Sequence, residues 1–242
     1  MATSAATFIE QTVEAKLILT SVFDTTRGGR GVEVYVTEDV IDLSHYAVSR
    51  GTNGRVIKGL PGADEDELEP VFIFPTITAS AGTFLTLGNE SRDFPLYFGF
   101  EADYYNTKLS FDGDDTAAIL RRDTSSSTGW SILDILGTQD IPETPPAIDT
   151  AWNYQDSWIY RKNGTTAKNV FDLNDWFYPT SGNPQSDHLD GIPKALAGGT
   201  GGFNGWGGTE PVPLGSYQVP EPSSIALIAV AGAMTLARRR KV

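Results

Sequence analysis

Short extended runs separated by turn residues constrain the fold of this chain more than any other feature. The runs are rich in β-branched, aliphatic and aromatic side chains, whereas Gly, Pro, Asn and Asp stand between them. The clearest of them are residues 15–23, 31–36, 71–74, 82–87, 130–136 and 157–161. About eight to ten short strands without a long amphipathic helix predict an all-β domain, either a β-sandwich or a barrel.

The connections between these runs carry their own predictions. Residues 108–111 and 116–121 flank an Asp-Gly-Asp-Asp turn, and Asp-Gly tolerates the positive φ of a tight turn, so a hairpin is predicted. Residues 42–48 predict a turn and a third strand that carries His45. The Gly-rich and acidic residues 51–69 predict a loop, and residues 91–98 predict one or two helical turns.

The composition changes after the last predicted strand. Residues 179–218 are rich in Gly, Pro, Asn and Ser and too poor in aliphatic side chains to form a core of their own. They predict a flexible Gly/Pro-rich spacer, with a mean reach of roughly 30–40 Å if they behave as Gly-rich coil.

Residues 219–242 combine three features in a fixed order. Proline fixes φ and lacks an N–H, so a Pro-Glu-Pro turn stops regular structure. That turn is Val219, Pro220, Glu221 and Pro222. The uncharged residues 225–237 follow and predict a single hydrophobic helix of roughly 20 Å. Its predicted membrane-anchoring side chains are Ile225, Leu227, Ile228, Val230 and Leu236.

A basic cluster then predicts the orientation of this helix. The cluster is Arg238, Arg239, Arg240 and Lys241. Positive flanks stay on the cytoplasmic side, so the residues that precede the helix are expected outside the cytoplasmic membrane. An ordinary C-terminal membrane anchor, or a buried apolar helix with a basic tail, is the alternative interpretation.

This order of VPEP, apolar helix and arginine cluster resembles the PEP-CTERM sorting signal of Gram-negative bacteria that produce exopolysaccharide. The resemblance implies recognition by an exosortase, a membrane-embedded protease thought to cut near the Pro-Glu-Pro motif. It also implies an exported, membrane-anchored precursor that passes to the cell surface or extracellular matrix, where exopolysaccharide is an expected partner.

The first residues do not look like a secretory signal. No basic residue precedes Lys16, and residues 1–14 contain only brief apolar patches, whereas a signal peptide has a cationic start and an apolar stretch. Residues 1–14 are therefore interpreted as a lead-in that remains after a lost signal peptide.

Residues 15–178 resemble the lamin tail domain family, an immunoglobulin-like β-sandwich. The matching positions are Glu33, Asp42, Leu43, Ser44, Gly82, Gly113, Asp114, Asp115, Leu120 and Asp134. Tyr46 stands near a position where the family often has Trp, and the loop of residues 51–69 is long. The resemblance implies a binding or anchoring module that carries no reaction of its own.

Composition and charge exclude several classes of function. The chain has no cysteine, which excludes disulfides and zinc sites built from Cys and His. It has 18 Lys and Arg against 31 Asp and Glu, a net charge of −13, which argues against nucleic acid as a partner. Catalytic candidates are few, because His45 and His188 are the only histidines and no Gly-x-Ser-x-Gly motif accompanies them. A hydrolase that uses a carboxylate pair stays open.

Two groups of side chains are candidate ligand sites. Asp112, Asp114 and Asp115 are oxygen ligands that would suit Ca²⁺, although the sequence favours a structural turn there and predicts no other cofactor. Trp152, Tyr154, Trp158 and Tyr160 recur at even spacing around Asp156. On one extended strand they would share a face that either stacks on sugar rings or, as we favour, packs the core. Asp156 and Arg161 would lie on opposite faces of that strand and not pair.

We therefore expect a non-enzymatic, exported β-sandwich that is sorted through its C-terminal signal. A glycan- or calcium-dependent adhesion module and a hydrolase are the two alternatives.

Overall fold

The computed structural model describes residues 15–24, 29–65, 67–92, 94–113, 115–139, 152, 154, 158–177 and 212–219. The predicted lead-in, residues 179–211 of the predicted spacer and the sorting segment from Pro220 onward lie outside them, as does the predicted C-terminal helix. Within the described ranges, no helix has the length and apolar character needed to cross a bilayer.

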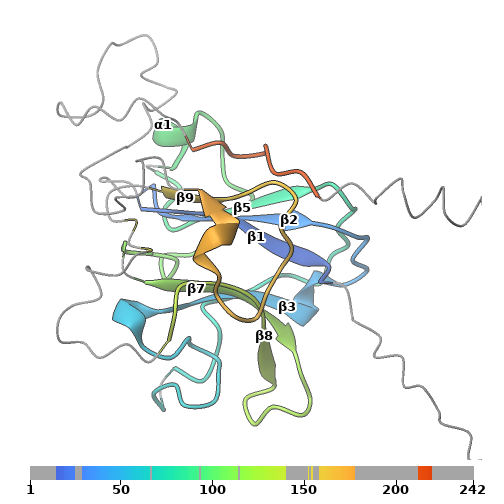
Figure 1. Cartoon of the computed structure of the whole chain (residues 1–242), viewed down its shortest axis with the longest axis vertical. Helices are drawn as coiled ribbons and strands as arrows, with labels where there is room; N and C mark the ends of the chain where they lie inside the picture. Colours follow the sequence, from blue (N-terminus) through green and yellow to red (C-terminus); the bar gives the residue numbers. More distant parts are fainter. Residues whose placement is uncertain are drawn as a thin grey trace, which may run out of the picture.

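The described residues form two β-sheets that lie in separate layers (Figure 1). The larger sheet has the strand order β10-β9-β1-β2-β5-β6, and the smaller sheet has the order β4-β3-β7-β8. The strands are β1 Leu17–Phe23, β2 Gly31–Val36, β3 Tyr46–Gly51, β4 Phe72–Ile73, β5 Phe84–Gly88, β6 Tyr104–Tyr105, β7 Thr116–Arg122, β8 Trp130–Leu136, β9 Trp158–Arg161 and β10 Trp176–Phe177. The helical elements are α1 Phe94–Phe98 and the 3-10 turns Leu43–His45, Thr52–Gly54 and Leu173–Asp175. The predicted all-β sandwich is confirmed.

Strand β1 is buried on both faces, and only Thr20 and Ser21 interrupt its apolar sequence. Leu17 and Leu19 belong to the core between the two sheets, whereas Ile18 belongs to a second cluster on the outer face of the larger sheet. The pairing of β1 with β2 shifts by one residue after Leu19. This β-bulge returns Val22, rather than Ser21, to the core between the sheets.

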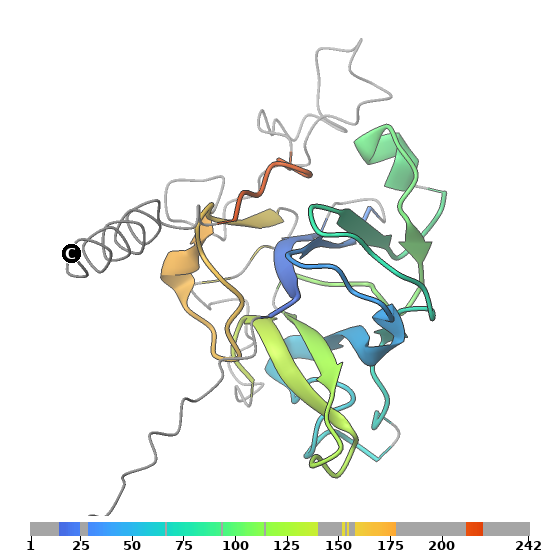
Figure 2. The ribbon, with the colours of Figure 1, turned by 90° about the vertical axis from the view of Figure 1, so that its right-hand side faces the viewer.

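Additional segments cover the outer faces of both sheets. On the larger sheet, Phe94 of α1 and Tyr217 pack with Ile18, Trp158 and Tyr160. Tyr217 belongs to residues 212–219, called the docked segment below, which run along this sheet on the side away from the smaller sheet (Figures 1 and 2).

The loop of residues 51–69 covers the outer face of the smaller sheet. Its side chains Ile57 and Leu60 pack with Leu120 of β7 and Trp130 of β8. The predicted loop is therefore present and has a structural role, because it buries apolar surface that β7 and β8 would otherwise expose.

Two local predictions are wrong. Strand β7 pairs with β3 and β8, and residues 108–111 form no strand, so residues 112–115 are a turn but not a hairpin. Leu109 and Phe111 are both fully buried in the core between the sheets, which explains an alternation that imitates a strand.

His45 lies in a 3-10 turn before β3 rather than on the strand, because Asp42 caps that turn by accepting a hydrogen bond from Ser44 N–H.

A buried ion pair joins the two sheets. Arg161 of β9 places one guanidinium nitrogen 2.6 and 2.7 Å from the two carboxylate oxygens of Asp134 on β8. Their side chains are 1% and 0% exposed. Arg161 Nε also donates to the carbonyl of Leu19 at 2.7 Å, and the guanidinium stacks on Trp176 at 4.3 Å. The partner of Arg161 is therefore an acid that the sequence analysis did not connect with it.

The Asp134 carboxylate is further satisfied by the backbone. It accepts hydrogen bonds from the N–H groups of Leu19, Ile135 and Lys168 at 2.9 to 3.1 Å. Hydrogen bonds to a carboxylate are stronger when it is ionised, so these donors and the guanidinium together support a buried charge pair.

Replacing Arg161 by Met tests how much this ion pair contributes to the stability of the fold. Loss of one partner leaves a buried, uncompensated carboxylate, so Arg161→Met is expected to lower the free energy of unfolding by about 3–5 kcal/mol. Urea denaturation of the full-length protein measures the change.

Arg55 offers a matched control, because its side chain is 55% exposed and pairs with Asp64 at 3.6 Å. Arg55→Met is expected to change stability by less than about 1 kcal/mol. Equal effects of the two substitutions would contradict the proposed role of Arg161.

Candidate functional site

The predicted aromatic ligand face is absent from the surface. Trp152, Tyr154, Trp158 and Tyr160 are all buried. Trp152 and Tyr154 belong to the core between the sheets, whereas Trp158 and Tyr160 belong to the cluster on the outer face of the larger sheet. Four buried rings offer no exposed face for stacking on sugar. They pack apolar clusters, but on the two faces of the larger sheet rather than as one shared face. Trp176 is buried in the core between the sheets as well, and Asp156 lies outside the described residues.

The acidic turn places its two described carboxylates against arginines. Asp115 is fully buried and lies 2.6 Å from Arg50 Nη1, and it also accepts a hydrogen bond from Asn53 N–H at 2.9 Å. Asp112 is 54% exposed and pairs with Arg30 at 2.8 Å. Burial raises the pKa of Asp115, and the nearby Arg50 partly offsets that effect.

Calcium at this turn stays a prediction. Asp114 lies outside the described residues, and among the residues that are described no three His, Asp or Glu side chains are grouped to hold a metal. Any cation there would compete with two guanidinium groups for Asp112 and Asp115.

Of the two histidines, His45 alone lies in the described part of the chain. His45 is exposed on its 3-10 turn, 3.9 Å from Asp42, and His188 lies outside the described residues. The geometry of His45 is that of a surface side chain beside a capping carboxylate.

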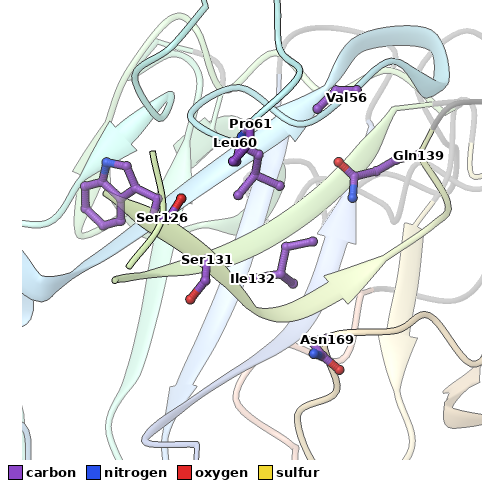
Figure 3. Close-up of a pocket in the computed structure, with 9 residues that line it drawn as sticks. Val56, Leu60, Pro61, Ser126, Ser131, Ile132, Gln139 and Asn169 are labelled. Carbon is purple, nitrogen blue, oxygen red and sulfur yellow. The ribbon is translucent and has the colours of Figure 1, made fainter. Parts of the chain in front are cut away.

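An open cavity of about 550 Å³ lies on the outer side of the smaller sheet (Figure 3). The loop after β3 supplies one wall, and the β7–β8 turn and β8 supply the second. Gln139 and Asn169 close the end. The lining residues are Val56, Leu60, Pro61, Ser126, Trp130, Ser131, Ile132, Gln139 and Asn169. The side-chain carbonyl of Gln139 accepts a hydrogen bond from Ile57 N–H at 3.0 Å, which fixes this amide to the loop after β3.

The chemistry of this cavity suits recognition rather than proton transfer. All nine lining residues belong to the described part of the chain, and none of them is ionisable. Apolar side chains with a few convergent amides and hydroxyls are typical of sites for uncharged ligands. The walls of this cavity come from the loop 51–69, β8 and Asn169, which no local motif connects, so it left no signal in the sequence.

A second unusual group is Glu33, a carboxylate on β2 that is only 1% exposed. Its side chain accepts hydrogen bonds from Thr20 Oγ1 at 2.7 Å, Tyr160 Oη at 3.0 Å and Gly215 N–H at 2.6 Å. Burial raises the pKa of Glu33 to about 7, although these three donors favour the ionised form. Burial also raises the pKa of Tyr160, which keeps the proton that Tyr160 donates.

The Gly215 donor belongs to the docked segment. The φ of Gly215 is +75°, a left-handed conformation that glycine adopts without strain and that turns the backbone N–H toward Glu33. The hydroxyl oxygen of Tyr160 accepts from the next two amides, Ser216 N–H at 3.2 Å and Tyr217 N–H at 2.9 Å. Three consecutive N–H groups thus point at one pair of side chains.

The remaining contacts hold the docked segment to the loop after β9. Gln218 N–H donates to Asn163 Oδ1 at 2.9 Å, and Gly164 N–H donates to the carbonyl of Gln218 at 2.9 Å. Tyr217 is 3% exposed, lies 5.3 Å from the ring of Tyr35, and donates its hydroxyl to the carbonyl of Thr165. Residues 212–218 were predicted as the end of a flexible spacer, but they are bound to the sandwich.

Comparison with known families identifies the C-terminal segment. Residues 218–241 match the PEP-CTERM protein-sorting motif, so the predicted sorting segment is confirmed. This motif marks proteins that are exported and membrane-anchored before exosortase cleavage and then placed at the cell surface or in the matrix. No curated protein and no solved structure matches the chain, and the resemblance to the lamin tail family stays a prediction.

Glu33 predicts how stability depends on pH. The folded state holds the Glu33 proton up to about pH 7, whereas the unfolded chain releases it near the ordinary value of 4.5. The raised pKa therefore contributes stability that is complete below pH 4.5 and is lost as the pH rises to about 7, by about 3 kcal/mol. Glu33→Gln is expected to remove this component, so the variant gains stability relative to the wild type across that range.

Urea denaturation at pH 4, 5.5 and 8 measures this difference. Glu69→Gln, at an exposed glutamate of the loop 51–69, is the matched control and is expected to track the wild type. A constant difference between Glu33→Gln and the wild type at all three pH values would show that Glu33 does not titrate as described.

Proposed function

We propose that the β-sandwich is a non-enzymatic binding module, sorted to the cell surface or matrix as an exosortase substrate, and that its cavity takes an uncharged polysaccharide. The sorting motif at residues 218–241 supports the destination. The cavity on the smaller sheet supports the molecular role, and the absence of any ionisable group among its nine described lining residues is the observation that carries the proposal.

The lining matches the two kinds of surface that a sugar presents. The C–H faces of a sugar ring are apolar and would pack on Val56, Leu60 and Ile132. The sugar hydroxyls both donate and accept hydrogen bonds, as do the side chains of Ser126 and Asn169. About 550 Å³ falls within the range of small-molecule sites, so one or two sugar units of a polymer fit.

Net charge selects among polysaccharides. The chain carries −13, so anionic polymers are repelled over the distance of about one Debye length. An uncharged polymer meets no such barrier, and none of the side chains that line the cavity carries a charge. The proposed partner is therefore the neutral fraction of an exopolysaccharide.

The positions of the buried carboxylates support a role without catalysis. Asp134 is paired with Arg161, Asp115 with Arg50, and Glu33 accepts three hydrogen bonds from neutral donors. These acids connect structural elements, and none of the three lines the cavity on the smaller sheet.

The C-terminal end of the protein in its host tests the sorting step. Mass spectrometry of the protein purified from the native host is expected to give a mature C-terminus near Pro220, because the sorting motif directs exosortase cleavage. A mature end beyond Arg240 would contradict processing.

Filling the cavity tests the binding role. Ser126→Trp, in the β7–β8 turn that lines the cavity, is expected to weaken binding to the neutral exopolysaccharide fraction at least about tenfold, since the indole would occupy the site, and a tenfold loss corresponds to about 1.4 kcal/mol. Co-sedimentation of the full-length protein with neutral and anionic fractions of purified exopolysaccharide measures the loss.

Ser80→Trp adds the same indole at an exposed serine away from the cavity, and it is expected to bind as the wild type does. Unchanged binding of Ser126→Trp, or preferential binding of the anionic fraction, would refute the proposed ligand.

A further inference from the structure

The docked segment leads directly into the sorting motif. The motif match begins at Gln218, and the docked segment ends at Val219, so the two overlap by two residues. Gln218 is tied to the sandwich on both sides of its backbone, because its N–H donates to Asn163 and its carbonyl accepts from Gly164. The N-terminal edge of the sorting motif is thus part of the folded surface.

Consecutive backbone N–H groups at this edge already donate hydrogen bonds to the sandwich. Four consecutive N–H groups donate to side chains of the sandwich, with Glu33, Tyr160 and Asn163 as the acceptors. The donors are Gly215, Ser216, Tyr217 and Gln218. A protease that binds its substrate as an extended chain uses the same main-chain groups, so docking on the sandwich and binding to a protease compete.

The length of chain up to the membrane segment strengthens this competition. Five residues, 220–224, separate Val219 from the apolar run that begins at Ile225. Fully extended, they span at most roughly 18 Å. While the docked segment stays bound, the folded sandwich is therefore held within about that distance of the apolar run, and a membrane-embedded enzyme must work in this interval.

We propose that the docked segment masks the N-terminal edge of the sorting motif, so that exosortase processing requires residues 212–219 to leave the sandwich. The proposal rests on the proposed function, because it presupposes a motif that an exosortase processes. It adds that the folded domain, rather than a free spacer, sets when the motif becomes accessible.

The docked segment is suited to release without unfolding of the domain. Its residues lie on the outer face of the larger sheet and contribute no strand to either sheet. Tyr217 is its one buried apolar side chain. Val212 and Leu214 pack against the same cluster while partly exposed, and the remaining contacts are hydrogen bonds to side chains and loop backbone. Segments with few buried apolar groups open locally at a small fraction of the global free energy of unfolding.

Asn163→Ala weakens docking with little risk to the fold. Asn163 is exposed and its side chain accepts the hydrogen bond of Gln218 N–H. Hydrogen exchange with mass spectrometry on the full-length protein in mild detergent is expected to show protected amides at residues 215–218. In Asn163→Ala, exchange at Gln218 is expected to rise roughly three- to tenfold, the equivalent of one net hydrogen bond. Asn174→Ala, at an exposed asparagine of the 3-10 turn Leu173–Asp175, is expected to leave exchange at Gln218 unchanged.

Pulse-chase labelling in the native host then measures the rate of processing. Asn163→Ala and Tyr217→Ala are expected to be processed faster than the wild type, and Asn174→Ala at the wild-type rate. Equal or slower processing of the first two variants would overturn the masking role. Unprotected amides at residues 215–218 in a protein that is still processed would overturn docking and masking and leave the proposed sorting function standing. Protected amides in a wild type that is never processed would overturn the proposed sorting function and the masking with it.

Discussion

The buried ion pair between Arg161 and Asp134 is the interaction on which the rest of the structure depends. It joins β9 of the larger sheet to β8 of the smaller sheet, and through Leu19 it also engages β1. Asp134 additionally binds the backbone of Lys168, so the pair fixes the end of the loop that follows β9. That loop carries Asn163 and holds the docked segment. A charge pair in the core is thus linked, contact by contact, to the start of the sorting motif.

The two candidate functions occupy opposite sides of the molecule. The neutral cavity lies on the outer side of the smaller sheet, where the loop 51–69 meets β8. The docked segment lies on the outer face of the larger sheet. Because the core between the sheets separates them, a polysaccharide bound in the cavity leaves the docked segment uncovered. The proposed binding and the proposed masking therefore concern separate surfaces of the sandwich.

Local sequence patterns predicted the strands well and their partners poorly. Residues 15–23, 31–36 and 130–136 contain β1, β2 and β8, because a buried strand needs a run of apolar and β-branched side chains. The alternation of apolar side chains at residues 108–111 predicted a strand wrongly, because Leu109 and Phe111 are buried in the core from irregular backbone. The aromatic residues Trp152 to Tyr160 looked like one face of one strand, but they divide between two clusters on either side of the larger sheet.

The sequence by itself determined the destination of this protein and its all-β character, because both depend on residues that are contiguous in the chain. A sorting motif is recognised as a linear order of residues, and strand preference is a local property of side chains. Only the tertiary structure decided which charges pair, where the cavity lies and that residues 212–219 are bound. Arg161 and Asp134 are 27 residues apart, and Glu33 and Gly215 are 182 apart. Such contacts depend on strand order and register, which bring distant residues together through the burial of a shared core and leave no local signal.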